Sequence, residues 1–269
     1  MKITSLSQKT DLLFSKFSGQ VIDKGEYLLI QTPENPTFHW GNYILFQEAP
    51  QKGDYKKWTE LFKHEFPYYD EIRHYVFAWP EDCPGESQEF LDNGFELEKV
   101  VALTAKKVVK PPKYNSQIMI KKLITDAEWE DAIHNQVCCA KEKFAGPGYE
   151  VFKRKQFAQY RLMYEQGRGN WYGAYIDGRL VGDLGIFTID NIGRFQNVGT
   201  HPDFRRQGIC QTLVYETALQ SLAEDKIETL VMEADSEYYA ARIYESVGFK
   251  PTENHFSLSW WHGGQASTV

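Results

Sequence analysis

The sequence predicts a mixed, mostly antiparallel, twisted sheet flanked by helices, an α/β (α+β) arrangement that occurs twice along the chain. Three observations predict it. Amphipathic helical segments alternate with short runs rich in β-branched and aromatic residues. The hairpin signal Asp177-Gly178 joins two of those runs, so that part of the sheet is antiparallel. The pairs Gly94-Phe95 and Gly248-Phe249 each close a short predicted helix, which indicates a duplication at domain scale.

Composition bounds the class of protein. The 269 residues are 42% hydrophobic with a net charge of −7, a normal globular balance that argues against a nucleic-acid or anionic-membrane binder. No apolar run approaches the roughly 20 residues that span a bilayer, and the first residues lack the apolar stretch of a signal peptide. We therefore expect a soluble, cytoplasmic protein. The cysteines show no metal-ligand spacing, so neither a metal site nor a disulfide is expected among Cys83, Cys138, Cys139 and Cys210.

A domain boundary is predicted within residues 106–117, where a Pro-Pro pair stands among charged and polar residues. We accordingly assign residues 1–110 to a first domain and residues 111–269 to a second. The expected elements of the first domain are strands at 42–47, 74–80 and 96–105 and helices at 55–66 and 86–93.

The second domain begins with a predicted strand at 118–123 and a helix at 126–143, which Thr125 and Glu128 are expected to cap as a capping box. A second helix ends near residues 167–170. Antiparallel hairpin strands come next, and then strand, helix, strand and helix alternate. Their expected bounds are strands at 170–177, 179–190, 194–200 and 228–234, a helix after residue 207, a helix at 237–247 and a closing strand after 249.

The stretch R-R-Q-G-I-C at residues 205–210 precedes an amphipathic helix. The amino end of a helix carries partial positive charge and unpaired N–H groups, so Arg205 and Arg206 are unfavourable there unless an anion is bound. We expect the N–H groups of Gln207, Gly208, Ile209 and Cys210 to cradle a diphosphate, with the arginines as counter-ions. Glycine at 208 would let the phosphate approach the backbone. The alternative is a solvated turn before an ordinary helix.

A second motif, A-A-R-I-Y-E-S-V-G-F, lies on the helix at 237–247. Glu237, Ala240 and Tyr244 fall on one face of that helix. Gly248 is placed to end it in a left-handed cap, with Phe249 packing back. Tyr244 could be a core aromatic residue whose hydroxyl is satisfied elsewhere, or a proton donor.

Together, in this order and with a strand before and between them, the two motifs resemble the signature regions of the Gcn5-related N-acetyltransferase (GNAT) superfamily. These regions are a pyrophosphate loop, Q/R-x-x-G-x-G/A, and a helix ending in Tyr-x-x-x-Gly-Phe. The resemblance covers residues 117 to about 261 and implies the acyl-CoA N-acyltransferase fold. The first domain matches only in outline, so the whole resembles a tandem of two GNAT-like domains.

The resemblance implies acetyl-coenzyme A as the cofactor and an N-acetyltransferase activity. Main-chain groups of Val198 and Thr200 would pair with pantetheine where their strand splays from the strand at 228–234. Tyr244 would protonate the departing thiolate, and Ala240, on the same helix face, counts among the cofactor-binding residues. Aligning the Gly-Phe pairs puts Phe90 of the first domain at the place of Tyr244, so the first domain should have neither a cofactor site nor a proton donor.

The chain departs from the family pattern at several positions. Cys210 replaces a usual Gly or Ala, and Glu237 stands where many relatives have an Asn that contacts the cofactor. Many relatives carry a Glu on the strand before the loop as the general base, whereas this strand offers only amides. Glu233, Asp183 or ordered water are the remaining candidates for that role.

We therefore predict an acetyl-CoA dependent N-acetyltransferase that moves an acetyl group directly to a primary amine of a small molecule or peptide. One alternative is a non-catalytic acetyl-CoA binding or sensor module, because the carboxylate is missing from the strand before the loop. A second is an acyltransferase with a different acyl donor. Neither nucleic acid nor membrane is expected as a partner, and the sequence does not indicate an oligomeric state.

Overall fold

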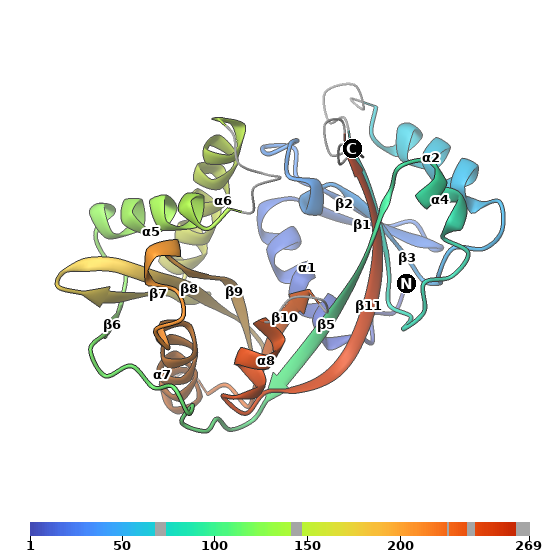
Figure 1. The fold of residues 1–269 in the computed structure, drawn as a ribbon. Helices are drawn as coiled ribbons and strands as arrows, with labels where there is room; N and C mark the ends of the chain where they lie inside the picture. The colour runs from blue at the N-terminus through green and yellow to red at the C-terminus, as the bar shows by residue number, and fades with distance from the viewer. Residues whose placement is uncertain (68–73, 141–146, 225, 236–239, 262–269) are drawn as a thin grey trace, which may run out of the picture. The chain divides into compact units, whose positions relative to one another are not determined.

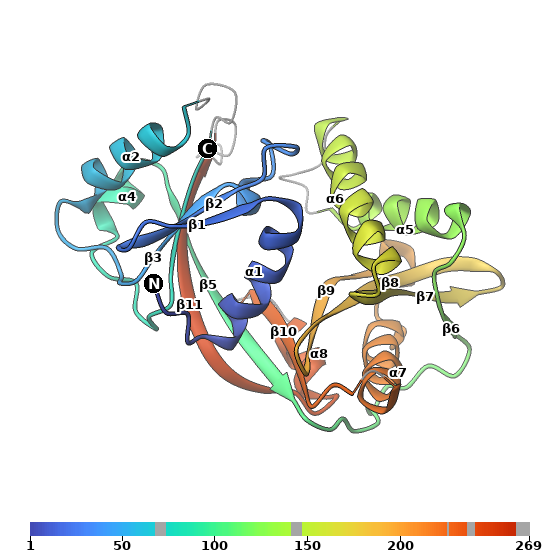
Figure 2. The same cartoon turned by 180° about the vertical axis from the view of Figure 1, so that it is seen from behind.

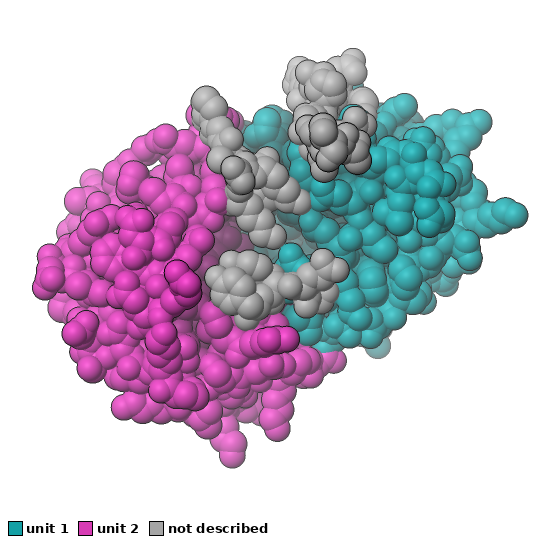
Figure 3. Space-filling view, in the orientation of Figure 1, with its two compact units in different colours: residues 1–101, 235–237, 253–269 teal, residues 102–234, 238–252 magenta. Residues whose placement is uncertain are grey.

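The computed structural model describes residues 1–67, 74–140, 147–224, 226–235 and 240–261. The chain divides into two compact units (Figure 3). Unit 1 comprises residues 1–101, 235–237 and 253–269, and unit 2 comprises residues 102–234 and 238–252. The C-terminal stretch thus groups with unit 1, which differs from the division expected from the sequence. The physical reason is strand pairing, since Phe256–Trp261 run antiparallel to His74–Trp79.

The strands hydrogen-bond in the order β1-β2-β3-β4-β11-β5-β10-β9-β8-β7-β6 (Figures 1 and 2). The pairs β3 with β4 and β9 with β10 are parallel. Neighbours along the chain pair antiparallel in β1–β2, β2–β3, β6–β7, β7–β8 and β8–β9, and β11 pairs antiparallel with the distant strand β4. This confirms the mixed, mostly antiparallel sheet. The strands are β1 (Gln20–Asp23), β2 (Tyr27–Gln31), β3 (Tyr43–Phe46), β4 (His74–Trp79), β5 (Glu96–Ala105), β6 (Met119–Lys122), β7 (Gly169–Ile176), β8 (Arg179–Ile189), β9 (Ile192–Thr200), β10 (Thr229–Asp235) and β11 (Lys250–Trp261).

In unit 1, the strands alternate their side chains between two helix layers. Leu28, Ile30, Val76 and Ala78 share one apolar cluster with Leu12 of α1. The intervening strand residues pack against the aromatic side chains of α2 and α4 on the other face. The helices of this unit are α1 (Leu6–Ser18), α2 (Asp54–Glu65) and α4 (Gln88–Asp92), with a 3₁₀ turn, η1 (His39–Gly41).

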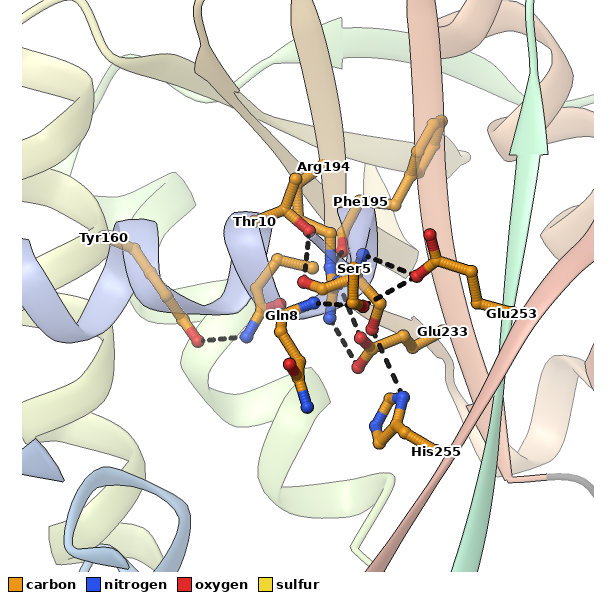
Figure 4. Close-up of polar contacts among 11 residues, drawn as sticks. Ser5, Gln8, Thr10, Tyr160, Arg194, Phe195, Glu233, Glu253 and His255 are labelled. Atoms are coloured by element: carbon orange, nitrogen blue, oxygen red, sulfur yellow. Dashed lines mark hydrogen bonds and ion pairs between the residues drawn. The ribbon is translucent and has the colours of Figure 1, made fainter. Parts of the chain in front are cut away.

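Helix α1 and strands β1 and β2 were not predicted. For α1, part of the signal that starts the helix comes from a residue distant in the sequence. The Ser5 side chain caps α1 by accepting from the Gln8 N–H. The Glu253 carboxylate accepts from the Ser5 hydroxyl at 2.7 Å and from the Leu6 N–H at 2.9 Å (Figure 4). A carboxylate at a helix amino terminus is favourable, but this one comes from the other end of the sequence.

In unit 2, α5 and α6 lie on one face of the strands and α7 lies on the other (Figures 1 and 2). The predicted capping box of Thr125 and Glu128 is present at the start of α5. The hairpin at Asp177-Gly178 is also confirmed, since both residues have positive φ, as a type I′ turn requires. The helices are α5 (Asp126–Cys138), α6 (Pro147–Glu165), α7 (Ile209–Glu224) and α8 (Ala240–Glu245), with a 3₁₀ turn, η3 (Pro202–Phe204).

The end of α8 has the predicted left-handed cap. Gly248 has φ +105°, and its N–H donates to the carbonyl of Glu245 at 2.9 Å. The Phe249 N–H donates back to the carbonyl of Tyr244 at 3.2 Å, and the Phe249 ring is buried. This is the hydrogen-bond pattern of a glycine-terminated helix.

The end of α4 in unit 1 repeats this arrangement bond for bond. Gly94 has φ +83° and donates to the carbonyl of Leu91 at 3.0 Å. Phe95 donates to the carbonyl of Phe90 at 3.1 Å. Phe90 therefore occupies the place that Tyr244 has in unit 2, as the alignment of the Gly-Phe pairs predicted.

Candidate active site

The loop that leads from β9 into α7 has an irregular backbone. After the turn of η3, Arg205 is extended, Arg206 has φ +62° and Gly208 has φ +79°. Successive changes between left- and right-handed conformations turn consecutive N–H groups toward the same side, which makes a concave site for an anion. The predicted phosphate loop therefore has a backbone suited to that role.

The N–H groups at the start of α7 are available for a ligand. Among the residues that the structure describes, none accepts a hydrogen bond from the N–H of Gln207, Gly208, Ile209 or Cys210, and the first helical bond runs from Thr212 to the carbonyl of Gly208. The side chains of Arg205 and Arg206 are exposed. Bare N–H groups, a helix dipole and two guanidinium groups together suit an anion such as a diphosphate.

A contact within the protein gives a second reason for glycine at position 208. A Cβ there would lie 2.1 Å from the main-chain oxygen of Lys113, so the linker and a positive φ both exclude a side chain. The Lys113 ammonium also donates to the carbonyl of Arg206. Asn115 donates to the carbonyl of Gln207 at 2.9 Å. These contacts hold the carbonyls of the loop and leave its N–H groups free.

Strand β9 carries a bulge next to this loop. Its register with β8 pairs Asp183 with Gly199 and then Gly185 with Gln196, so β9 has one extra residue between those positions. Asn197 lies there with φ +48°. The parallel pairing with β10 stops at Arg194 and Val231. A bulge re-aims main-chain groups and ends pairing, and this supports the predicted splay beside Val198.

Thr200, at the end of β9, contacts side chains of Arg205, Cys139 and Cys210. Its carbonyl accepts from the Arg205 guanidinium Nε and from the Cys139 thiol, each at 3.3 Å. Its side chain interacts with the Cys210 thiol. Burial raises the pKa of Cys139 to about 11 and that of Cys210 to about 12, so neither thiol is a reactive thiolate at neutral pH.

Helix α8 holds Ala240 and Tyr244, and Tyr244 is 6% exposed. Helices α7 and α8 pack together, and the Ser246 hydroxyl donates to the Gln211 amide oxygen at 3.5 Å. The tyrosine helix therefore lies beside the first turn of α7. Glu237, which was expected at the start of this helix, lies outside the described residues.

Glu233 lies on β10, two residues beyond the last pair with β9. Arg194 of β9 binds its carboxylate through two nitrogens, at 2.7 and 2.9 Å (Figure 4). Arg194 is 4% exposed, and its Nε donates to the carbonyl of Phe195 at 3.1 Å. Sequence reasoning missed this pair, because nothing local connects position 194 with position 233. The pair argues against Glu233 as a base, because a carboxylate bound by a guanidinium is stabilised in its unprotonated form.

Asp183 is fully buried on β8 and accepts from three side chains. The Trp171 indole N–H lies 2.8 Å from its Oδ2, and the amides of Asn135 and Gln136 lie 2.5 and 3.1 Å from its Oδ1. Burial raises the pKa of Asp183 to about 7, and the three donors act in the opposite direction. The carboxyl group joins α5 to β7 and β8, next to the β9 bulge.

The structure thus brings the predicted cofactor residues of β9, the loop and α7 into one continuous region, with Ala240 and Tyr244 on the neighbouring helix. It binds Glu233 to Arg194 instead of leaving it free. Sequence reasoning missed Lys113 and Asn115, for which the polar composition of the linker was the only signal. In the described part of the chain, no three His, Cys, Asp or Glu residues are grouped to hold a metal ion, and no helix is both long and apolar enough to cross a membrane.

Comparison with known proteins gives a consistent result. A family model for the acetyltransferase (GNAT) domain matches residues 123–261. The chain is similar to a functionally unknown conserved protein from Staphylococcus epidermidis, with a TM-score of 0.74 and 16% identity over 91% of this chain and 95% of that one. A GCN5-related N-acetyltransferase from Kribbella flavida has a TM-score of 0.65 and 14% identity over 96% of both chains.

A third solved structure is a tandem GNAT protein from the clavulanic acid biosynthesis pathway, with a TM-score of 0.50 and 14% identity over 81% of this chain and 77% of that one. No curated protein matches the chain. The structural matches share the fold over nearly the whole length, and the family model covers more than half of the residues. The chain belongs to the GNAT acetyltransferase family.

Proposed function

We propose that the protein is an acetyl-CoA dependent N-acetyltransferase whose cofactor site and catalytic groups all belong to unit 2. The observation that carries the proposal is the amino end of α7. There the N–H groups of Gln207–Cys210 have no acceptor among the described residues, and Arg205 and Arg206 are exposed beside them. Such an end favours an anion, and the diphosphate of coenzyme A is one.

Each remaining part of the site has a role in this proposal. Acetyl-CoA supplies the thioester when it is bound. Main-chain groups of Val198 and Thr200 would hold its pantetheine arm along β9, beyond the last pair with β10. N–H groups of the bulged stretch would stabilise negative charge on the carbonyl oxygen. Tyr244 would donate its phenolic proton to the departing sulfur.

The acceptor amine must lose a proton before or during attack. Arg194 holds both oxygens of Glu233, and three donors hold the buried Asp183. We therefore propose that ordered water accepts this proton. Glu233 would instead keep the ends of β9 and β10 in place. Glu233→Gln should accordingly retain most of the turnover, whereas a loss of about 100-fold or more would restore Glu233 as the base.

Two measurements on the full chain test the proposal. Calorimetry with coenzyme A should give one site per chain, and Arg205→Glu/Arg206→Glu should weaken it. Release of free thiol from acetyl-CoA, followed with a thiol reagent across a panel of primary amines, should identify an acceptor. No binding of coenzyme A would contradict the proposed site. Binding without thiol release from any amine would contradict the transferase.

A second candidate, a non-catalytic acetyl-CoA binding module, is favoured by one observation. Strand β9 carries the amides of Gln196 and Asn197 where many relatives have a carboxylate, and the Gln196 amide donates to the Tyr160 hydroxyl at 2.8 Å. Of the two candidate carboxylates on strands, Glu233 is held by Arg194 and Asp183 by three donors. This candidate predicts tight binding of acetyl-CoA with no amine-dependent thiol release.

A further inference from the structure

Helix α6 of unit 2 buries a lysine side chain. Lys153 is 5% exposed. The rings of Tyr149 and Phe152 each lie 5.6 Å from its ammonium nitrogen. Burial lowers the pKa of Lys153 to about 8, so the side chain still carries a proton for most of the time at neutral pH. Burying such a charge is costly unless it has a partner.

The ammonium of Lys153 has three N–H donors but only one acceptor within the described residues. That acceptor is the neutral amide oxygen of Gln156, 2.9 Å away. No carboxylate of the described chain forms an ion pair with Lys153. The nearby Asp183 adds a favourable charge, but both of its oxygens accept from the amides and the indole described above.

Gln156 is fixed in one orientation. Its amide oxygen accepts from Lys153 and also from the Asn197 amide, at 2.9 and 3.0 Å. Two donors on the same atom leave the amide nitrogen of Gln156 as a donor, and no described residue accepts from it. The spare N–H groups of Lys153 and the nitrogen of Gln156 are thus hydrogen-bond donors three residues apart on one helix, with no acceptor among the residues that the structure describes.

These donors are connected to the bulge of β9. Asn197 has φ +48° at that bulge, its amide donates to Gln156 and to the Tyr160 hydroxyl at 3.0 and 3.4 Å, and its carbonyl accepts from Gln136 at 2.7 Å. Tyr160 and Lys153 both lie on α6. Lys153 therefore lies one side chain away from the strand position where the proposed acetyl transfer takes place.

We propose that Lys153 and Gln156 bind a carboxylate of the acceptor, so that the acceptor is an amino acid or another amine that carries a carboxylate. This inference rests on the proposed transferase function and names its substrate class. One ammonium N–H and one amide N–H match the two oxygens of a carboxylate. A polyamine would instead bring positive charge toward a buried ammonium, which is unfavourable.

The test compares acceptors that differ only in the carboxylate: L-lysine with cadaverine, L-ornithine with putrescine, and L-phenylalanine with phenethylamine. Thiol release by the wild-type chain should show a kcat/KM at least about tenfold higher for the carboxylate member of at least one pair. Lys153→Met should raise KM for that member by about tenfold or more and leave the affinity for coenzyme A unchanged. Lys155→Met, which removes an exposed lysine of the same helix, is the matched control.

Gln156→Glu is a second variant that should not threaten folding, because it gives the buried ammonium an ion-pair partner. It should raise the melting temperature and abolish the preference for the carboxylate member. Equal use of both members of every pair, or a preference that survives in Lys153→Met and Gln156→Glu, would overturn the inference while leaving the transferase intact.

If no acceptor supports thiol release, the transferase proposal fails. Calorimetry then tests separately whether Lys153 and Gln156 bind a carboxylate. Carboxylate members should then bind the coenzyme A complex at least about tenfold more tightly than their amine partners, and Lys153→Met should remove the difference. Equal binding, or no binding of either member, would overturn the carboxylate site.

Discussion

The first turns of α2 in unit 1 and α7 in unit 2 follow corresponding strands but are occupied differently. Asp54 opens α2, and its carboxylate accepts from the Gln51 N–H at 2.9 Å. The preceding loop is also held by its own side chains, since Glu81 accepts from the Ala49 N–H at 2.7 Å. In unit 1, carboxylates of the protein thus accept from two N–H groups of this loop, and one of them opens the helix. The first turn of α7 has no acidic residue.

Whereas the starts of α2 and α7 differ, the ends of the later helices α4 and α8 are alike. The ends of α4 and α8 share the same glycine cap and the same return hydrogen bond to Phe90 and Tyr244 respectively. The scaffold has been kept in both units, but the groups at these two places differ. Unit 2 has an arginine pair before α7 and a tyrosine hydroxyl on α8, where unit 1 has an acidic first turn in α2 and Phe90 on α4.

The largest expected effect concerns the hydroxyl. Tyr244→Phe gives unit 2 the side chain that unit 1 already has at this place, so folding and cofactor affinity should be preserved. Turnover should fall by about 100-fold, the usual contribution of a general acid. Thiol release and calorimetry on the same preparation separate the two quantities. Unchanged turnover would remove Tyr244 from the mechanism.

The next effect concerns the arginines at the helix start. Arg205→Glu/Arg206→Glu should raise the dissociation constant for coenzyme A by about 10- to 100-fold, because two charge-assisted contacts are replaced by repulsion. The matched control is Lys56→Glu/Lys57→Glu in the first turn of α2, where both lysines are exposed. Calorimetry should show equal affinity for the control and the wild type. Equal affinity in the arginine variant would contradict the cradle.

The buried carboxyl group of Asp183 in unit 2 gives a pH test. The pKa of Asp183 rises from 3.8 to about 7 on folding, so the folded state binds the proton more tightly. The free energy of local opening should therefore decrease as pH rises from about 4 through about 7, by at most about 1.4 kcal/mol per pH unit.

Lys153, with a folded pKa of about 8, is largely protonated in both states below pH 7 and adds little slope there. Hydrogen exchange of α5 and β8 peptides, corrected for the intrinsic pH dependence of amide exchange, measures the effect. Asp183→Asn should flatten it, while peptides of unit 1 should behave alike in both proteins. A slope that persists in Asp183→Asn would contradict the assignment to this carboxyl group.

The smallest effect comes from giving α7 the kind of charge that α2 has. Gln207→Glu adds a carboxylate at the helix start without changing the size of this exposed side chain. It should stabilise α7 by about 0.3–1 kcal/mol and weaken coenzyme A binding by about two- to fivefold, because the charge acts on the dipole and on the anion with opposite signs. Thermal unfolding and calorimetry should move in these opposite directions. A change of the same sign in both would contradict the comparison.

Much of the fold could be predicted because its signals are local. The capping box at Thr125, the turn at Asp177-Gly178 and the glycine cap at Gly248 each depend on residues within a few positions of one another. What could not be predicted depends on distant pairs. Glu253 at the start of α1 and the pairing of β11 with β4 connect the two ends of the chain, and no local pattern encodes them.

The same division holds for the site. The loop at 205–210 and Tyr244 were predicted from the spacing within two local motifs. The bulge at Asn197, the ion pair of Arg194 with Glu233 and the buried Lys153 depend on neighbours 36 to 61 residues away or on burial. The sequence therefore predicted a place for an anion. It did not predict that Arg194 binds the candidate base Glu233, or that the buried Lys153 lies near the proposed acceptor site.

The most direct test is a crystal structure of the full chain with coenzyme A. Our account predicts one molecule per chain, with its diphosphate within hydrogen-bond distance of the N–H groups of Gln207–Cys210 and no ligand at the start of α2. A diphosphate bound elsewhere, or a second molecule at the first turn of α2, would contradict it.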